Sequence, residues 1–201
     1  MKTTFFLILV FSSIINCNSQ TAEEFFYKGV AKADLQDYRG AISDYNKTIE
    51  INPNSANAYI NRGVAKFELQ DYSGAISDYN KAIEINPDDA NAYNNRGNAK
   101  RKLQDYRGTI SDCNKAIEIN PNHAEAYYNR GIAKYELQDC SGAISDFTKV
   151  IEINPDDANA YYNRGAAKIN LGQKNSGCLD LSKAGELGYS QAYDVIKEFC
   201  N

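Results

Sequence analysis

Apolar side chains recur along this chain with the spacing of amphipathic helices. Two stretches, 56–69 and 73–85, each place apolar residues three and four positions apart, which puts them on one face of a helix. The first stripe is Ala58, Tyr59, Ala65 and Leu69, and the second is Ala75, Ile76, Tyr79, Ala82 and Ile83. Asp71 and Ser73 are suited to cap the second helix, and Pro87 ends it because proline cannot continue a helix.

This pair of helices repeats with a fixed period. The only four prolines of the chain lie 34 residues apart, at Pro53, Pro87, Pro121 and Pro155. A period of this size indicates a solenoid, so we number positions 1 to 34 from Ala22. The predicted repeats are 22–55, 56–89, 90–123, 124–157 and 158–189, within a repeat region of 20–189. Residues 190–201 are predicted to form a capping helix, because the terminal units of a solenoid differ from the others.

Small residues mark where the two helices of a repeat approach each other. Glycine occupies position 8 in all five repeats, at Gly29, Gly63, Gly97, Gly131 and Gly165. A glycine inside a helix costs about 1 kcal/mol relative to alanine, so its recurrence at one position requires a packing reason. Close approach of the paired helix is that reason.

These positions resemble the tetratricopeptide repeat (TPR) family: an aromatic at 4, Gly at 8, Ala at 20, an aromatic at 24, Ala at 27 and Pro at 32. The resemblance implies an all-α, right-handed α-solenoid of five helix-turn-helix units followed by the capping helix. The chain departs from the family by carrying Arg at position 7 and Lys at position 11. Its Asn-Arg-Gly strings are similar to those of an exported bacterial variety of the repeat.

The resemblance also implies that positions 2, 5, 6, 9, 12 and 13 line a concave groove. Position 6 carries a row of asparagines: Asn61, Asn95, Asn129 and Asn163. An amide both donates and accepts hydrogen bonds, so such a row suits an extended peptide whatever its sequence. The alternative is that these amides bond to neighbouring repeats. Other groove candidates are the polar Asn94, Asn98 and Arg101 and the possible anchors Tyr128, Tyr135 and Tyr162.

Charged residues at fixed positions are interpreted as scaffold. Arg at position 7 and Asp at position 23 are expected to form one ion pair per repeat, because their geometries match. Lysines at positions 11 and 26 are interpreted as solvated faces.

The N-terminus has the anatomy of a secretory signal peptide, predicted to cover 1–19. A short positive start precedes an apolar run at 5–15, and small residues precede Gln20. This run is too short to span a bilayer, which needs about 20 residues. An alternative is a lipoprotein signal, in which Cys17 becomes lipidated. We therefore expect an exported protein, periplasmic or secreted, with lipid at Cys17 as its only expected link to a membrane.

Export permits disulfides, and four cysteines follow the predicted cleavage site. Cys178 and Cys200 are one candidate pair, which would hold the capping helix to the fifth repeat. Cys113 and Cys140 are a weaker candidate pair, with free buried thiols as the alternative.

Catalysis has little support in the sequence. The single histidine, His123, lies in a turn, and no phosphate-binding or metal-binding spacing occurs, so no cofactor is expected. The net charge of −4 argues against nucleic acid, which binds basic patches. The sequence predicts a protein-interaction module that binds a peptide or extended partner segment. The alternative is an envelope lipoprotein that serves as a structural component of a multiprotein assembly.

Overall fold

The computed structural model describes residues 21–200 and contains only helices in that range. The helices are α1 (Ala22–Asp34), α2 (Tyr38–Ile51), α3 (Ala56–Glu68), α4 (Tyr72–Ile85), α5 (Ala90–Lys102), α6 (Tyr106–Ile119), α7 (Ala124–Glu136), α8 (Cys140–Ile153), α9 (Ala158–Asn170), α10 (Lys174–Glu186) and α11 (Ala192–Phe199). Each predicted repeat holds one pair of these helices.

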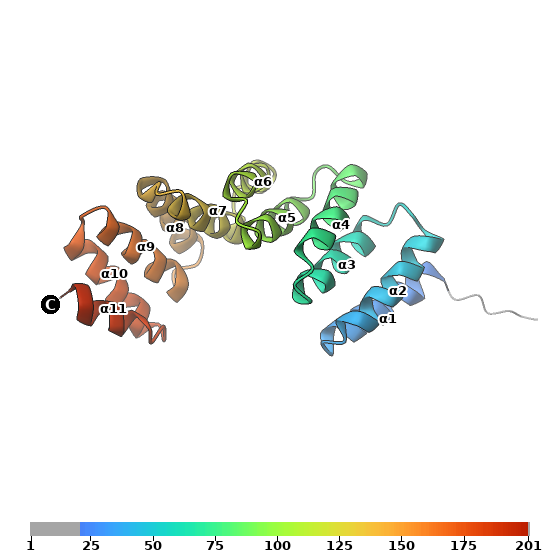
Figure 1. Ribbon diagram of the computed structural model, residues 1–201, viewed down its shortest axis with the longest axis horizontal. Coiled ribbons are helices and arrows are strands. Elements are labelled where there is room, and N and C mark those ends of the chain that lie inside the picture. The colour runs from blue at the N-terminus through green and yellow to red at the C-terminus, as the bar shows by residue number, and fades with distance from the viewer. Residues whose placement is uncertain (1–20, 201) are drawn as a thin grey trace, which may run out of the picture.

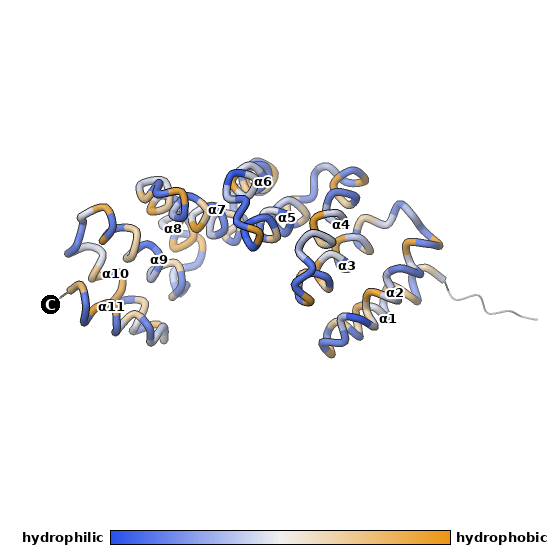
Figure 2. Tube along the Cα trace, viewed as in Figure 1, coloured by the Kyte–Doolittle hydropathy of each residue, from blue (hydrophilic) through white to orange (hydrophobic). Residues whose placement is uncertain are grey.

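The helix pairs stack one after another into an elongated arch (Figure 1). Every helix packs on the next helix along the chain, and contacts between distant repeats are absent from the described residues. Apolar residues are therefore distributed along the whole length and not gathered in one centre (Figure 2). The predicted all-α solenoid is confirmed, and its stability is expected to come from pairs within repeats and between neighbouring repeats.

The helix boundaries follow from local chemistry. Asp71 accepts a hydrogen bond from the backbone N–H of Gly74 at 2.9 Å, so it caps α4 as predicted, while Ser73 lies within the first turn. The turn before it uses a left-handed residue, Gln70, with φ of 63°. The same turn in the fifth repeat uses Gly172, which adopts this conformation without a steric cost.

Position-8 glycines lie where the paired helix comes closest, as predicted. A Cβ added to Gly63 would lie 2.6 Å from Cε1 of Tyr79, and one added to Gly131 would lie 2.8 Å from Cε1 of Phe147. These aromatic rings are fully buried against the glycines. The third repeat is looser, because Cys113 replaces the aromatic ring there, and the nearest atoms to such a Cβ on Gly97 lie at 3.3 Å.

Each of the last four repeats contains an ion pair between positions 7 and 23, as predicted. Arg62 donates to both oxygens of the buried Asp78, at 2.9 and 2.6 Å, and its Nη1 donates to Asn46 of the preceding repeat at 2.7 Å. The equivalent pairs are Arg96–Asp112, Arg130–Asp146 and Arg164–Asp180. Each arginine therefore connects its own two helices to the previous repeat.

The interpretation of the position-11 lysines as solvated was wrong. The Nζ of Lys66 lies 2.7 Å from Asp78, and its side chain is only 22% exposed. Lys100, Lys134 and Lys168 make the same contact with the Asp of their own repeats. In the first repeat Lys32 pairs with Asp44 but keeps 42% of its side chain exposed, and it is the one cation that pairs with Asp44 among the described residues. A buried carboxylate is costly unless paired, so in the last four repeats two cations on one Asp offset that cost. The sequence pattern pointed to one cation per carboxylate and did not show the second.

Helix α11 caps the last repeat. It packs on α10, and Ala192 is fully buried in a cluster with Leu181 and Ala184. Residues Ser190 and Gln191, predicted to belong to this helix, lie in the turn that precedes it.

Candidate peptide-binding groove

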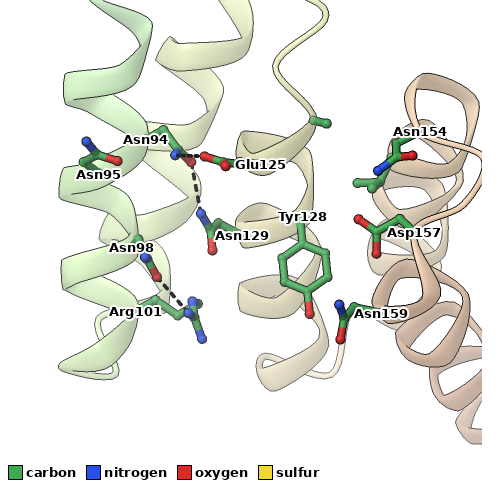
Figure 3. A pocket seen from close by; sticks show the side chains of 12 residues that line it. Asn94, Asn95, Asn98, Arg101, Glu125, Tyr128, Asn129, Asn154, Asp157 and Asn159 are labelled. Carbon is green, nitrogen blue, oxygen red and sulfur yellow. Dashed lines mark hydrogen bonds between the residues drawn. The ribbon is translucent and has the colours of Figure 1, made fainter. Parts of the chain in front are cut away.

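The largest of the three hollows described in this section lies along α5 and α7 and reaches the start of α9 (Figure 3). Its volume is about 670 Å³. Its lining residues are Asn94, Asn95, Asn98, Arg101, Ala124, Glu125, Tyr128, Asn129, Val150, Asn154, Asp157 and Asn159. Six of the predicted groove residues thus come together: Asn94, Asn95, Asn98, Arg101, Tyr128 and Asn129. Hydrogen-bonding side chains line most of this surface.

The amides at the centre of this hollow already bond to each other. Asn129 donates to Oδ1 of Asn94 at 3.0 Å, and Asn94 donates to Oε2 of Glu125 at 3.3 Å. Both asparagines are buried, with 7% and 3% exposure. These bonds fix the two amides and join the third repeat to the fourth. Asn129 therefore follows the alternative interpretation of the asparagine row, in which the amides bond to neighbouring repeats.

The same arrangement recurs between the fourth and fifth repeats. Asn163 donates to the hydroxyl oxygen of Tyr128 at 3.0 Å and also to the backbone oxygen of Asn159. Asn170 donates to the hydroxyl oxygen of Tyr135 at 2.6 Å. Burial raises the pKa of both tyrosines, against the lowering effect of these hydrogen bonds, so both hydroxyls keep their protons at neutral pH. Each hydroxyl therefore still has one O–H to donate.

The asparagine row separates into two groups for a simple reason. Each bonded pair joins residues 35 positions apart, from one repeat to the next. By this spacing the neighbours of Asn61 and Asn95 are Phe26 and Ile60, whose side chains have no hydrogen-bonding atoms. No side-chain hydrogen bond joins Asn61 or Asn95 to any other described residue, and both amides are half-buried. Both amides are therefore without a side-chain partner in the described residues, but only Asn95 lines a hollow, and Asn61 lines none of the hollows described in this section.

Arg101 differs from the four arginines of the ion-pair network. Its Nη2 donates to Oδ1 of Asn98 at 2.7 Å, but its Nε is shielded from solvent without an acceptor. No carboxylate within residues 21–200 lies within ion-pair distance of it. Arg101 thus brings an unpaired positive charge to one end of the groove, and Figure 3 shows it on the side of α5 that faces α7.

A second, smaller hollow adjoins the first on the other side of α5. Its volume is about 120 Å³, and Val64, Phe67, Glu68 and Tyr79 line it, so both apolar and polar groups face it. Asn95 and Asn98 line both hollows, so the two are continuous. In Figure 3, Asn95 lies on the side of α5 that faces away from α7.

A third hollow lies at the N-terminal end of the arch. Its volume is about 320 Å³, and its lining residues include Phe26, Tyr27 and Asn57. Phe26 and Tyr27 occupy the same repeat positions as Tyr128 and Asn129 do in the largest hollow. The groove thus recurs at the same register in the first repeat, with an aromatic lining instead of a polar one.

Two predicted anchors do not line the largest hollow. Tyr135 makes its contact with Asn170, and Tyr162 stacks against Tyr189, with ring centroids 4.6 Å apart. Conversely, Asn154 and Asp157 line the hollow from the turn before α9. The sequence prediction considered only the first helix of each repeat and so missed them. Their place beside Pro155, in the turn between repeats, was the available signal.

The cysteines adopt one of the two candidate pairings. Cys178 and Cys200 are joined, with Cα atoms 5.8 Å apart, so α11 is tied to α10. Cys113 and Cys140 are free thiols, so the prediction that they form a second disulfide was wrong. Cys113 is buried among Ala116 and Ala126, whereas Cys140 begins α8 and is partly exposed. Burial raises the pKa of Cys113 to about 12, which keeps it a neutral thiol.

The predicted signal peptide and Cys17 lie outside the described residues. Within the described part of the chain, no helix is both long and apolar enough to cross a membrane. No group of three or more potential metal ligands occurs there either.

The helix pairs stack into an arch, and the first helix of each pair contributes side chains to its hollows. This architecture is that of an α-solenoid repeat protein. Family models place it further: the TPR repeat model matches residues 29–70, 65–104 and 133–172, and tetratricopeptide repeat models match 90–123 and 113–139. The chain belongs to the TPR family. Comparison with curated proteins gave no match.

Solved structures share this fold. A crystal structure of MamA is 25% identical, with a TM-score of 0.75, covering 86% of this chain and 94% of that one. YrrB, described as a TPR protein with an unusual peptide-binding site, is 22% identical, with a TM-score of 0.74 and coverage of 90% and 94%. PilF of Pseudomonas aeruginosa is 16% identical, with a TM-score of 0.76 and coverage of 83% and 76%.

Proposed function

We propose that this protein is an interaction module whose groove binds an extended peptide segment of a partner. The observation that carries the proposal is the series of three hollows along the arch, two of them at the same repeat register and two sharing Asn95 and Asn98. A hollow surface that continues over several repeats suits a long, thin ligand better than a compact one. Solenoids commonly use such extended concave surfaces for binding.

The chemistry of the groove supports a peptide ligand. Backbone N–H and C=O groups of an extended chain need partners when they leave water, and amides supply both kinds. Asn61 and Asn95 have both functions available, and Tyr128 has one O–H left to donate. The fold is shared with YrrB, which is described as having a peptide-binding site. Peptide binding is therefore within the capability of this architecture.

The test is a selection of random peptides on the purified protein, followed by affinity measurement with single variants. Asn95→Ala is expected to weaken the selected peptides about fivefold to tenfold, since one neutral hydrogen bond contributes roughly 1 kcal/mol. Asn175→Ala, which removes an exposed amide at the start of α10, is the matched control and should leave affinity unchanged. Equal affinity for the wild type and both Asn61→Ala and Asn95→Ala would contradict the proposal.

We also propose that the protein is exported, with 1–19 removed as a signal peptide. The joined Cys178 and Cys200 support this, because disulfides persist in oxidising compartments. Intact mass of the native protein tests cleavage before Gln20. Mass analysis of alkylated, unreduced protein tests the disulfide, with only Cys113 and Cys140 expected to react after unfolding. Four reactive thiols would contradict the pairing.

A lipid-anchored assembly component is the second candidate function. The sequence Ile14-Ile15-Asn16-Cys17 favours it, because it resembles a lipoprotein signal. In that case the native mass would show a chain that begins at Cys17 and carries acyl groups. A native chain that begins at Gln20 would exclude the anchor.

A further inference from the structure

We infer that Tyr189 closes the groove at the fifth repeat, where its ring takes the place that a ligand side chain would take against Tyr162. The bound segment therefore ends at the start of α9, and Tyr189 is the residue that sets this limit. This inference rests on the proposed function, because it names the residue that ends the same groove.

The sequence changes at the end of the fifth repeat. Positions 31 and 32 are Asn and Pro in the first four repeats, as in Asn154-Pro155, but Gly188 and Tyr189 in the fifth. The backbone of Asn154 has φ of −130°, whereas Gly188 has φ of 97°, in the left-handed region that glycine enters without a steric cost. The chain therefore changes direction here, at the point where each earlier repeat continues into the next one.

The turn after α10 brings Tyr189 against α9. The N–H of Tyr189 donates to the oxygen of Ala184 at 2.9 Å, and the N–H of Gly188 donates to the oxygen of Gly185 at 3.0 Å. These two bonds form the Schellman motif, which ties the residue after the glycine to the last turn of the helix. The ring of Tyr189 stacks on Tyr162, with ring centroids 4.6 Å apart.

Tyr162 occupies a position that lines a hollow in two other repeats. Position 5 is Tyr128 in the largest hollow and Phe26 in the hollow at the N-terminal end of the arch. In the fifth repeat the space beside this position holds Tyr189, and both rings pack on the buried cluster that contains Leu181. A side chain of the protein itself thus meets the position-5 ring where a ligand would meet it in the fourth repeat.

The largest hollow ends where Tyr189 begins to cover α9. Asn159 is the last residue along the chain that lines this hollow, and it lies about one helical turn before Tyr162. Burial is the main reason for the raised pKa of Tyr128, and Tyr189 adds a smaller electrostatic contribution, so Tyr189 lies within electrostatic range of that hydroxyl. These observations place Tyr189 next to the hollow, on its C-terminal side.

The cap holds the ring of Tyr189 in place. Helix α11 begins three residues later, and its Ala192 is fully buried against Leu181 and Ala184. The bond between Cys178 and Cys200 ties α11 to α10. Tyr189 is thus fixed by the turn that contains it and by the helix that follows. We expect its ring to stay in place when a ligand binds.

The first measurement tests whether the space beside Tyr162 accepts an external ring. Tyr189→Ala removes the stacked ring, and p-cresol supplies the same aromatic group in solution. We expect p-cresol to shift the NMR signals of the Tyr162 ring in Tyr189→Ala and to leave them unchanged in wild type. Tyr106→Ala is the matched control, because it removes a half-buried tyrosine that lines none of the three hollows.

The second measurement tests whether that space belongs to the groove. Peptides are selected separately on wild type and on Tyr189→Ala. We expect peptides from Tyr189→Ala to carry an additional aromatic residue and to bind wild type about tenfold more weakly, because the stacking and burial of that residue are lost. Adding Tyr162→Ala to Tyr189→Ala should remove this gain. Tyr189→Phe keeps the ring and should select the same peptides as wild type.

The outcomes separate the inference from the proposed function. Circular dichroism and the mass of alkylated, unreduced protein confirm that each variant keeps its helices and its joined cysteines. Peptides that depend on Asn95 but are the same from both selections would overturn the inference and leave the proposed function standing.

Two further results would also overturn the inference. One is wild-type peptides that bind Tyr189→Ala at least tenfold more weakly, because Tyr189 would then belong to the binding surface. The other is the absence of p-cresol binding to Tyr189→Ala. Binding of p-cresol to Tyr189→Ala, without any selected peptide that depends on Asn95, would instead contradict the proposed function and leave an aromatic site beside Tyr162.

Discussion

At the scale of single residues, the same position in successive repeats performs different tasks. Asn129 and Asn163 hold neighbouring repeats together, whereas Asn61 and Asn95 have no such partner. The sequence predicted the row but not this division, because the division depends on which residue lies one repeat away and one position earlier. Ile60 cannot accept a hydrogen bond, and Asn94 can. Knowledge of the 35-residue spacing between contacting positions would have been enough to predict it.

The position-8 glycines give a stability prediction with an internal control. Gly63→Ala is expected to destabilise the protein by about 1–3 kcal/mol, because the new Cβ would collide with the buried Tyr79 ring. Gly97→Ala is expected to stay within about 1 kcal/mol of wild type. Its Cβ would meet Cys113 at 3.3 Å, a mild contact that the better helix propensity of alanine offsets. Urea denaturation measures both, and equal losses would contradict the close-approach account.

Buried ionisable groups predict a loss of stability at alkaline pH. Burial raises the pKa of both Cys113 and Tyr45 to about 12. The unfolded chain ionises these groups near pH 8.5 and 10. Their contribution is therefore fully present below about pH 8.5 and is lost as the pH rises toward 12. Urea midpoints should fall between pH 8 and pH 11, and less so in Cys113→Ala. A constant midpoint over this range would contradict the burial of these groups.

At the scale of helices, boundaries were largely predictable, because caps and turns are local. Aspartates at the turn cap each of α2, α4, α6 and α8, and the prolines follow the ends of these helices. The last helix was the exception at its start, since Ser190 and Gln191 remain in the turn. Its position depends on burial of Ala192 and on the cysteine pair, which are tertiary features.

Helix α11 is expected to depend on Cys200. Cys200→Ser removes a crosslink over 22 residues, which in the chain-entropy account contributes about 3 kcal/mol. We expect faster hydrogen exchange of the α11 amides and unchanged exchange in α3 to α6. Cys140→Ser is the matched control, because that thiol is free, and it should leave α11 as in wild type. Unchanged exchange of α11 in Cys200→Ser would show that packing alone holds the cap.

At the scale of the whole molecule, the 34-residue period fixed the architecture, because each repeat packs only on its neighbours. The site was less predictable. Arg101 was predicted as a groove residue, but the sequence did not show that it has no carboxylate partner. Every other partly buried arginine of the described residues is paired with an aspartate. The turn residues Asn154 and Asp157 belong to the groove because the arch brings the start of α9 beside α7.

The central claim is that a peptide lies along the groove and bonds to its free amides. The most direct measurement is the NMR signal of the asparagine side-chain NH₂ groups during titration with a selected peptide. We predict shifts for Asn95 and Asn98, with little change for Asn46, Asn80 and Asn114, whose amide oxygens bind the ion-pair arginines. Shifts confined to those three, with Asn95 and Asn98 unmoved, would contradict the claim.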